Sequence, residues 1–304
     1  MYLQHFGLRE LPFSLTPNTQ FFLNMASYHK AYNMLMVSLA NAEGFIKIVG
    51  EVGTSKTMLC RKVLNTLEED KENYVTAYIP NPVLSPKGLF LAFAEELNIE
   101  IDQDVGHHRL LKAITEKLVE FSAANKQVVL FIDEAHAMPE QTLEALRLLT
   151  NIETEQVKLF QVVLFAQPEL DISLSQPSLR QLRQRITFSF EIEALDREGV
   201  ERYVVHRLAT AGYNGPFLFS KRALDFLFRA SEGIPRVINI LCHKALMVVF
   251  GKGERSVQVD HIRDAADDTE GVVLPSFNYR PALIAIGGIA VGAAVVFYLG
   301  VLNL

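Results

Sequence analysis

The sequence predicts an α/β fold with a mainly parallel β-sheet, followed by a smaller all-helical domain and a C-terminal transmembrane helix. Short β-branched or aromatic stretches alternate with helix-period segments up to Leu195, which is the pattern of a parallel sheet covered on both faces. Beyond Leu195 only helical periodicity remains. The chain then ends in an uncharged apolar run that is long enough to cross a bilayer.

The expected elements divide the chain into two folded parts, an α/β domain at 1–195 and a helical domain at 196–270. Apolar stretches bounded by polar residues predict strands at 45–49, 74–79, 128–132, 159–165 and 186–192. Helical periodicity in the α/β part predicts helices at 56–69, 86–98, 108–124 and 139–152. In the second part it predicts helices at 196–212, 220–231, 235–250 and 258–269.

A membrane anchor is predicted at residues 282–302, with residues 271–281 as its linker. The run contains neither a charged residue nor a proline, and as a helix it matches the ~30 Å thickness of a hydrocarbon core. A buried helix is the alternative interpretation. Arg280 precedes the run and no basic residue follows it, so the positive-inside rule leaves most of the chain in the cytoplasm.

Charge and cysteine content limit the possible functions. The formal net charge is −6, whereas a general nucleic-acid binder usually carries a basic surface. Cys60 and Cys242 lie far apart and outside any metal-ligand spacing, which favours two buried thiols in a reducing compartment. The N-terminus lacks the basic and apolar pattern of a secretory signal.

The first motif is a phosphate-binding loop between the strand at 45–49 and the helix that begins near Lys56. The G-x-x-x-x-G-K-[ST] pattern places backbone N–H groups around a phosphate, a lysine on the β- and γ-phosphates, and a hydroxyl on Mg²⁺. Lys56 and Thr57 would fill the last two roles. The predicted nucleotide-binding residues are Gly50, Glu51, Val52, Gly53, Thr54, Ser55, Lys56, Thr57 and Met58.

Ser55 departs from this pattern because glycine is usual immediately before the lysine. A Cβ atom at this position could crowd the phosphates, or it could fit at modest cost if φ is negative. A chance glycine-rich turn that opens a helix is the alternative to a phosphate loop.

The second motif is the pair Asp133–Glu134 at the end of the strand 128–132. Asp133 is placed to hold Mg²⁺, and Glu134 is placed to act as a general base on a water that attacks the γ-phosphate. Two carboxylates that cap the following helix are the alternative. Both motifs follow strands, and the carboxyl ends of parallel strands are where open α/β sheets bind ligands.

Four further residues are candidates for catalysis or nucleotide binding. Gln167 follows the strand 159–165 and could sense the γ-phosphate, or it could be a plain turn residue. Arg183 or Arg185 could project into the site of a neighbouring subunit and stabilise transition-state charge, although a solvated basic turn containing Arg180 is the alternative. Arg236, at the start of a predicted helix, could reach the phosphates from the helical domain, or it could lie on the surface.

The ordered motifs resemble those of the general-secretion-pathway-A-like AAA+ ATPases, and within that family the subgroup that serves biogenesis of the mannose-sensitive haemagglutinin pilus, a type IV pilus. The resemblance covers about residues 1–270. The segments that carry it are MYLQHFGLRELPFSLTPNTQFFL, GEVGTSKTMLCRKVL, LFIDEAHAM, FAQPEL, LRQLRQRI and GIPRVINILC. The family loop usually reads GEVGTGKT, so Ser55 is a departure that concerns hydrolysis more than binding.

The resemblance implies a P-loop AAA+ core with a helical lid, and ATP and Mg²⁺ as cofactors. It implies that Gln167 is the sensor on the fourth strand, that Arg183 or Arg185 is the trans-acting finger, and that Arg236 is the lid sensor. The expected protein is a homo-oligomeric, ring-forming ATPase in the bacterial inner membrane, whose partners are inner-membrane proteins of a pilus or secretion apparatus.

Three alternatives to a pilus-assembly ATPase remain open from the sequence. The chain could be the ATPase of a type II secretion system. It could be a nucleotide-switched scaffold with low turnover, because of Ser55. It could also be a DNA-associated ATPase of the transposition type, although the acidic balance and the predicted membrane span make a nucleic-acid partner the least favoured.

Overall fold

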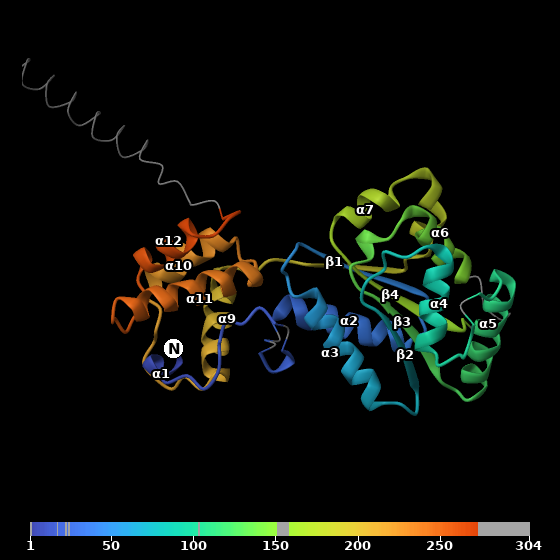
Figure 1. The fold of residues 1–304 in the computed structure, drawn as a ribbon, viewed down its shortest axis with the longest axis horizontal. Coiled ribbons are helices and arrows are strands. Elements are labelled where there is room, and N and C mark those ends of the chain that lie inside the picture. Colours follow the sequence, from blue (N-terminus) through green and yellow to red (C-terminus); the bar gives the residue numbers. More distant parts are fainter. Residues whose placement is uncertain are drawn as a thin grey trace, which may run out of the picture.

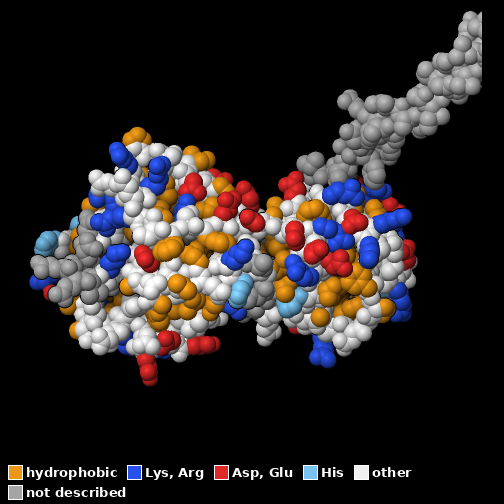
Figure 2. Space-filling view, turned by 180° about the vertical axis from the view of Figure 1, so that it is seen from behind, with side chains coloured by type: hydrophobic (Ala, Val, Ile, Leu, Met, Phe, Trp, Pro, Cys, Tyr) orange, Lys and Arg blue, Asp and Glu red, His pale blue; other side chains and the backbone are white. Residues whose placement is uncertain are grey.

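The computed structural model describes residues 2–272 except for 17, 22, 24, 103 and 151–157. An α/β lobe and a helical lobe lie next to each other in the described part (Figure 1). From the opposite side the two lobes meet at a narrower waist (Figure 2). The predicted membrane span at 282–302 lies outside the described residues, and no described helix is both long and apolar enough to cross a membrane.

The α/β lobe contains a five-stranded sheet in the order β2-β3-β4-β1-β5, in which every neighbouring pair is parallel. All five predicted strands are present, with small differences at their ends. Since the strands are parallel, their carboxyl ends lie along a single edge of the sheet. The strands are β1 (Phe45–Gly50), β2 (Tyr74–Ile79), β3 (Gln127–Ile132), β4 (Phe160–Ala166) and β5 (Phe188–Ile192).

Helices cover both faces of this sheet (Figure 1). On one face lie α2 (Ala26–Ala40) and α3 (Lys56–Glu69), and on the other lie α4 (Pro86–Glu96), α5 (His107–Ala123) and α6 (Glu140–Leu149). Successive side chains of a strand point to opposite faces. In β4 this alternation puts Val163 in the core under α2 and α3, and Val162 in the core under α4, α5 and α6.

The helix α2 has no counterpart among the predicted elements. No side chain caps its N-terminus at Met25, so the usual start signal is missing from the sequence. Tyr28, Ala31, Leu35 and Leu39 are all buried along one side of the helix. Its stability therefore comes from packing against the sheet rather than from local signals. Three short helices were also not predicted, namely α1 (Tyr2–Phe6), α7 (Glu169–Leu174) and α8 (Arg180–Arg185).

The helical lobe consists of α9 (Arg197–Thr210), α10 (Lys221–Ser231), α11 (Pro235–Gly251) and α12 (Val259–Asp267). The starts of α9, α10 and α11 have recognisable local causes. The Asp196 side chain accepts a hydrogen bond from the backbone N–H of Gly199, and the Ser220 hydroxyl accepts one from that of Ala223. Proline occupies the first turn of α11, where its missing N–H costs nothing.

The N-terminal segment packs on the helical lobe, although the sequence pattern grouped it with the α/β part. The Tyr2 hydroxyl lies 2.8 Å from Nδ1 of His243 in α11. The backbone N–H of Arg9 donates to the carbonyl of Ala211 at 2.8 Å. A single apolar cluster joins α1, the α2–α3 face of the sheet and the four helices of the helical lobe. The two lobes therefore share part of their core.

Candidate nucleotide-binding site

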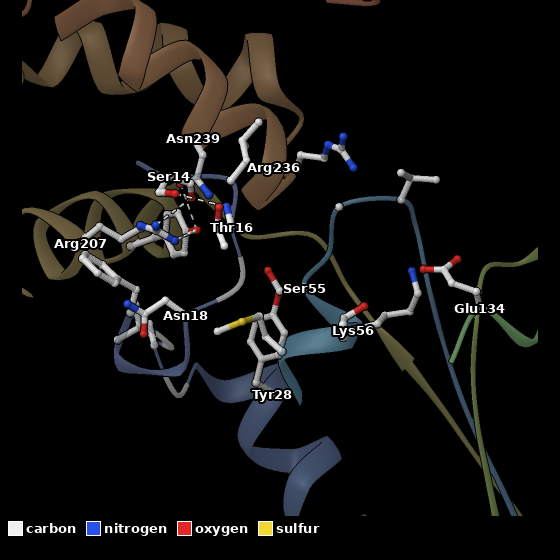
Figure 3. Close-up of a pocket in the computed structure, with 18 of the residues that line it drawn as sticks. Ser14, Thr16, Asn18, Tyr28, Ser55, Lys56, Glu134, Arg207, Arg236 and Asn239 are labelled. Carbon is white, nitrogen blue, oxygen red and sulfur yellow. Dashed lines mark hydrogen bonds between the residues drawn. The ribbon is translucent and has the colours of Figure 1, made fainter. Parts of the chain in front are cut away.

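A cavity of about 280 Å³ lies at the carboxyl end of β1, between the two lobes. Three parts of the chain form its wall: the N-terminal segment around Ser14, the phosphate loop, and the helical lobe with Arg236 and Asn239. Lys56 and Glu134 lie at one end of this cavity and Arg207 and Asn239 at the other (Figure 3). A ligand that fills the cavity would therefore contact an ammonium and a carboxylate group at one end, and a guanidinium and an amide group at the other.

The helical lobe contacts the phosphate loop directly at Gly53. The backbone N–H of Arg236 donates to the Gly53 carbonyl at 3.2 Å. Gly53 has a φ of +84°, and a Cβ atom added to it would lie 2.6 Å from Cβ of Arg236. Only glycine allows both the positive φ and this close approach.

Ser55 takes the left-handed conformation, with φ +61° and ψ +29°. The negative φ that would have accommodated the serine side chain is therefore not the one adopted. The backbone at this position has the conformation that glycine adopts readily. A residue with a Cβ atom, such as serine, is strained in this conformation by roughly 1–2 kcal/mol. A hydrogen bond from the Ser55 hydroxyl to the hydroxyl of Tyr28 holds the side chain, and Tyr28 in turn donates to the Thr54 carbonyl at 2.5 Å.

We expect Ser55→Gly to leave steady-state ATP turnover within about threefold of the wild type, because the loop already follows the glycine-compatible path. Its free energy of unfolding should stay within about 1 kcal/mol, since relief of strain offsets the lost hydrogen bond. Ser55→Ala keeps the strain but loses the hydrogen bond, and should be about 1 kcal/mol less stable than the wild type. ATPase assays and urea denaturation measure these changes; turnover that rises more than tenfold in Ser55→Gly would favour the low-turnover scaffold.

Lys56 is buried, with 5% of its surface exposed. Its Nζ donates to the carbonyls of Gly50 at 2.7 Å and Glu51 at 2.9 Å. Burial lowers the pKa of Lys56, and the carboxylates of Glu134 and Asp133 act in the opposite direction. The ammonium group is therefore held inside the loop beside the two carboxylates of the second motif.

Asp133 and Thr57 lie next to each other, as magnesium binding would require. Asp133 is 3% exposed, and burial raises its pKa, while hydrogen bonds from the Thr57 hydroxyl and the Glu134 backbone N–H act to lower it. The backbone bond is 2.9 Å long. A carboxylate and a hydroxyl are oxygen donors of the kind Mg²⁺ prefers, so these two residues fit the ion.

Glu134 is oriented by a side chain from the neighbouring strand. Nε2 of Gln167, just after β4, donates to Oε2 of Glu134 at 3.1 Å. His136, which the sequence interpretation did not select, lies with Nδ1 3.6 Å from the same oxygen and accepts from the Gln167 backbone N–H at 3.4 Å. Glu134 itself has a φ of +52°, so its carboxylate is held in place by backbone conformation and by neighbours.

The structure brings most of the predicted site residues together but separates two arginines from them. The phosphate loop, Glu134, Gln167 and Arg236 line one cavity, and Asp133 lies against Thr57. Arg183 is exposed on α8, whereas Arg185 donates to the Thr150 hydroxyl at 2.7 Å. Arg185 also lines a second cavity beside Phe45, the first residue of β1 and therefore at the opposite end of that strand from the phosphate loop.

The end of the cavity farthest from Lys56 was not predicted from the sequence. Six residues lie where the N-terminal segment faces the helical lobe, namely Ser14, Thr16, Asn18, Tyr203, Arg207 and Asn239. Tyr28, which also lines the cavity, belongs to α2 and lies against the phosphate loop. Four of the six lie in segments that carry the family resemblance, but the sequence assigned no role to any of them; these four are Ser14, Thr16, Asn18 and Asn239. The six residues meet because Pro12 and Ser14 lie against Arg207 of the helical lobe, a contact that spans almost 200 positions between Pro12 and Arg207.

Comparisons with known proteins agree with this geometry. Residues 40–174 match the family described as "AAA domain". The chain is 41% identical over 272 residues to general secretion pathway protein A of Aeromonas hydrophila, an alignment that covers 90% of this chain and 49% of that relative. The chain therefore spans about half the length of that protein.

The fold is similar to that of solved Cdc6p and ORC structures. The Cdc6p structure of Pyrobaculum aerophilum superposes with a TM-score of 0.67 at 17% identity, covering 86% of this chain and 72% of that one. Drosophila ORC bound to DNA gives 0.65 at 17% identity, with 87% and 65% covered. The Aeropyrum pernix ORC2 structure in ADPNP–ADP complexes gives 0.61 at 14%, with 86% and 73% covered.

The sheet is parallel, a phosphate loop and two carboxylates follow its strands, and the helical lobe contacts the phosphate loop. These features together define an AAA+ P-loop ATPase. The match to the AAA domain and the relative from Aeromonas hydrophila narrow this class further. The chain belongs to the family of general-secretion-pathway-A-like AAA+ ATPases.

Proposed function

We propose that this protein hydrolyses ATP with Mg²⁺ and uses the cycle to support assembly of a type IV pilus or a type II secretion apparatus at the bacterial inner membrane. One observation carries the enzymatic part of the proposal. Gln167 holds the carboxylate of Glu134 on the cavity that Lys56 also lines, so a base and a cation face the same space at the carboxyl edge of the sheet.

Each residue in this arrangement has a distinct task. Glu134 would take a proton from the attacking water, and the amide of Gln167 fixes the carboxylate oxygen that does so. Lys56 and Arg236 would neutralise negative charge on the phosphates from opposite lobes. Mg²⁺, when bound by Thr57 and Asp133, would screen charge on the β- and γ-phosphate oxygens.

Similar proteins support a nucleotide ligand and the cellular setting. The A. pernix ORC2 structure, which has a similar fold, is in complex with ADPNP and ADP. General secretion pathway protein A gives the link to protein secretion, and the motif resemblance to pilus ATPases gives the link to type IV pili. The uncharged run at 282–302 would place the lobes at the cytoplasmic face of the inner membrane.

Two alternatives have weaker support. Some proteins of similar fold are bound to DNA, such as Drosophila ORC, but this chain has a net charge of −6. Acidic and basic side chains are interspersed over both lobes on the face shown in Figure 2, without the basic stripe that DNA binding favours. A low-turnover scaffold is motivated only by Ser55. The left-handed conformation of Ser55 gives the loop the same backbone path that glycine would adopt, which weakens this alternative.

The exposed Arg183 fits a homo-oligomer in which one subunit completes the site of the next. We expect the specific ATPase activity to require Mg²⁺ and to rise with protein concentration, as subunits associate. Arg183→Ala should lower that activity by at least about tenfold, because a positioned cation that stabilises transition-state charge would be lost. A mixture of Arg183→Ala with Glu134→Gln should regain part of the activity, since some interfaces then pair an intact Arg183 with an intact Glu134.

Arg180→Ala is the matched control for this experiment, since Arg180 is exposed on the same short helix. It should behave as the wild type. If Arg183→Ala is as active as Arg180→Ala, or if the mixture stays inactive, Arg183 is not a trans-acting residue. A rate per subunit that does not change on dilution would argue against catalysis between subunits.

A further inference from the structure

The end of the cavity farthest from Lys56 carries a polar cluster that the phosphate chemistry does not use. Tyr203 and Arg207 come from α9, and Asn239 comes from α11. All three line the cavity and are at least nine-tenths buried. Since the phosphate loop fixes the other end, this cluster lies where the base of a bound nucleotide would reach.

The hydrogen bonds in this cluster run in a fixed direction. A guanidinium group can only donate, and Arg207 donates through Nη1 to the Tyr203 hydroxyl oxygen at 3.0 Å. Its Nε and Nη2 donate to the carbonyls of Pro12 and Ser14. The single proton of the Tyr203 hydroxyl then goes to Oδ1 of Asn239 at 3.1 Å. Burial raises the pKa of Tyr203, so this proton is retained at neutral pH.

This chain of donors sets the orientation of the Asn239 amide. With Oδ1 occupied by Tyr203, the amide NH₂ is directed away from the hydroxyl. Among the described residues, none accepts a hydrogen bond from this NH₂ group. The nitrogen is also not fully enclosed by the protein, since it is absent from the buried side-chain atoms that lack a hydrogen-bond partner. It therefore has access to the cavity, into which Asn239 projects from α11 (Figure 3).

We propose that Asn239 is a base-recognition residue, which the Arg207–Tyr203 pair locks with its NH₂ group toward the cavity so that it donates a hydrogen bond to a ring nitrogen of adenine. This inference rests on the nucleotide binding of the proposed function. Asn239 would present a hydrogen-bond donor at the base end of the site. The site would therefore select a base that carries a hydrogen-bond acceptor opposite Asn239.

The test measures equilibrium binding of ATP and its 1-deaza, 3-deaza and 7-deaza analogues to the full chain under non-hydrolysing conditions. Each analogue replaces one ring nitrogen by C–H. We expect one analogue to bind the wild type about tenfold more weakly than ATP. Asn239→Ala should bind ATP about tenfold more weakly and should no longer distinguish that analogue from ATP. Equal binding of all four ligands by the wild type, or discrimination that persists in Asn239→Ala, would overturn the assignment.

Inorganic tripolyphosphate, which has no base, separates recognition from folding. Its affinity should stay within about twofold of the wild type in Asn239→Ala and in Tyr203→Phe. Tyr203→Phe removes the proton that pins Oδ1, so it should lose part of the discrimination while keeping the amide. Equal losses for ATP and tripolyphosphate would make Asn239 a structural residue and overturn the inference. A wild type that binds neither ligand would instead overturn the proposed function.

Discussion

Replacing Glu134 with Gln should lower steady-state ATP hydrolysis about 10²- to 10⁴-fold, which is the range for loss of a general base. Binding of ATP should stay within about threefold of the wild type. The amide has nearly the shape of the carboxylate and can still accept the hydrogen bond from Gln167, but it cannot take a proton from water. Turnover assays and titration with a fluorescent ATP analogue measure the two quantities separately.

Glu140→Gln is the matched control because it removes a carboxylate from the exposed first turn of α6, close in sequence but outside the cavity. Its turnover should equal that of the wild type. Wild-type turnover in Glu134→Gln would show that Glu134 does not activate the water. Loss of ATP binding in that variant would instead show that the carboxylate maintains the shape of the site.

Substitution of Gly233 by Ala should lower the free energy of unfolding by at least about 3 kcal/mol, through strain and overpacking together. Gly233 joins α10 to α11 with a φ of +74°, and an added Cβ atom would lie 2.0 Å from the backbone oxygen of Leu195. Leu195 also donates its N–H to the Gly233 carbonyl at 2.9 Å. The new methyl group would therefore displace the backbone at the junction of the two lobes, and urea denaturation would measure the loss.

Two other glycines separate the causes of this effect. Gly253 has a φ of +70° but nothing within 4 Å of an added Cβ, so Gly253→Ala should cost only about 1 kcal/mol. Gly251 ends α11 with an ordinary φ and open space around it, so its alanine variant should be neutral or slightly stabilising. Similar losses in Gly233→Ala and Gly253→Ala would show that the contact with Leu195 is unimportant.

The sheet was predictable because its three central strands, β1, β3 and β4, are largely apolar and are buried on both faces, and because helices with clear periodicity lie between the strands. The helix α3 was predicted at its observed bounds, Lys56–Glu69. The carboxylates after β3 and the amide after β4 were also predictable as neighbours, because parallel strands end at one edge. The hydrogen bond between Gln167 and Glu134 follows directly from the adjacency of β3 and β4.

Features that depend on distant segments could not be predicted in this way. Sequence alone left the sign of φ at Ser55 open, since it depends on how the loop meets Tyr28 and the helical lobe. The helix α2 has no cap signal and is stabilised by the sheet. The polar cluster around Arg207 depends on hydrogen bonds to the carbonyls of Pro12 and Ser14. The hydrophobic periodicity of the sequence does not indicate where these carbonyls lie.

The placement of α1 on α11 also has a consequence for biosynthesis. The partner of Tyr2 in the native state is His243, 241 positions later. At about 5–20 residues per second, the ribosome needs roughly 10–50 seconds to make the intervening chain. During this interval the α/β lobe can assemble around its own strands, while the first helix waits with its apolar side chains uncovered. The segment that contains α1 is thus made long before α11, and its contacts with that helix form only after most of the described chain has been synthesised.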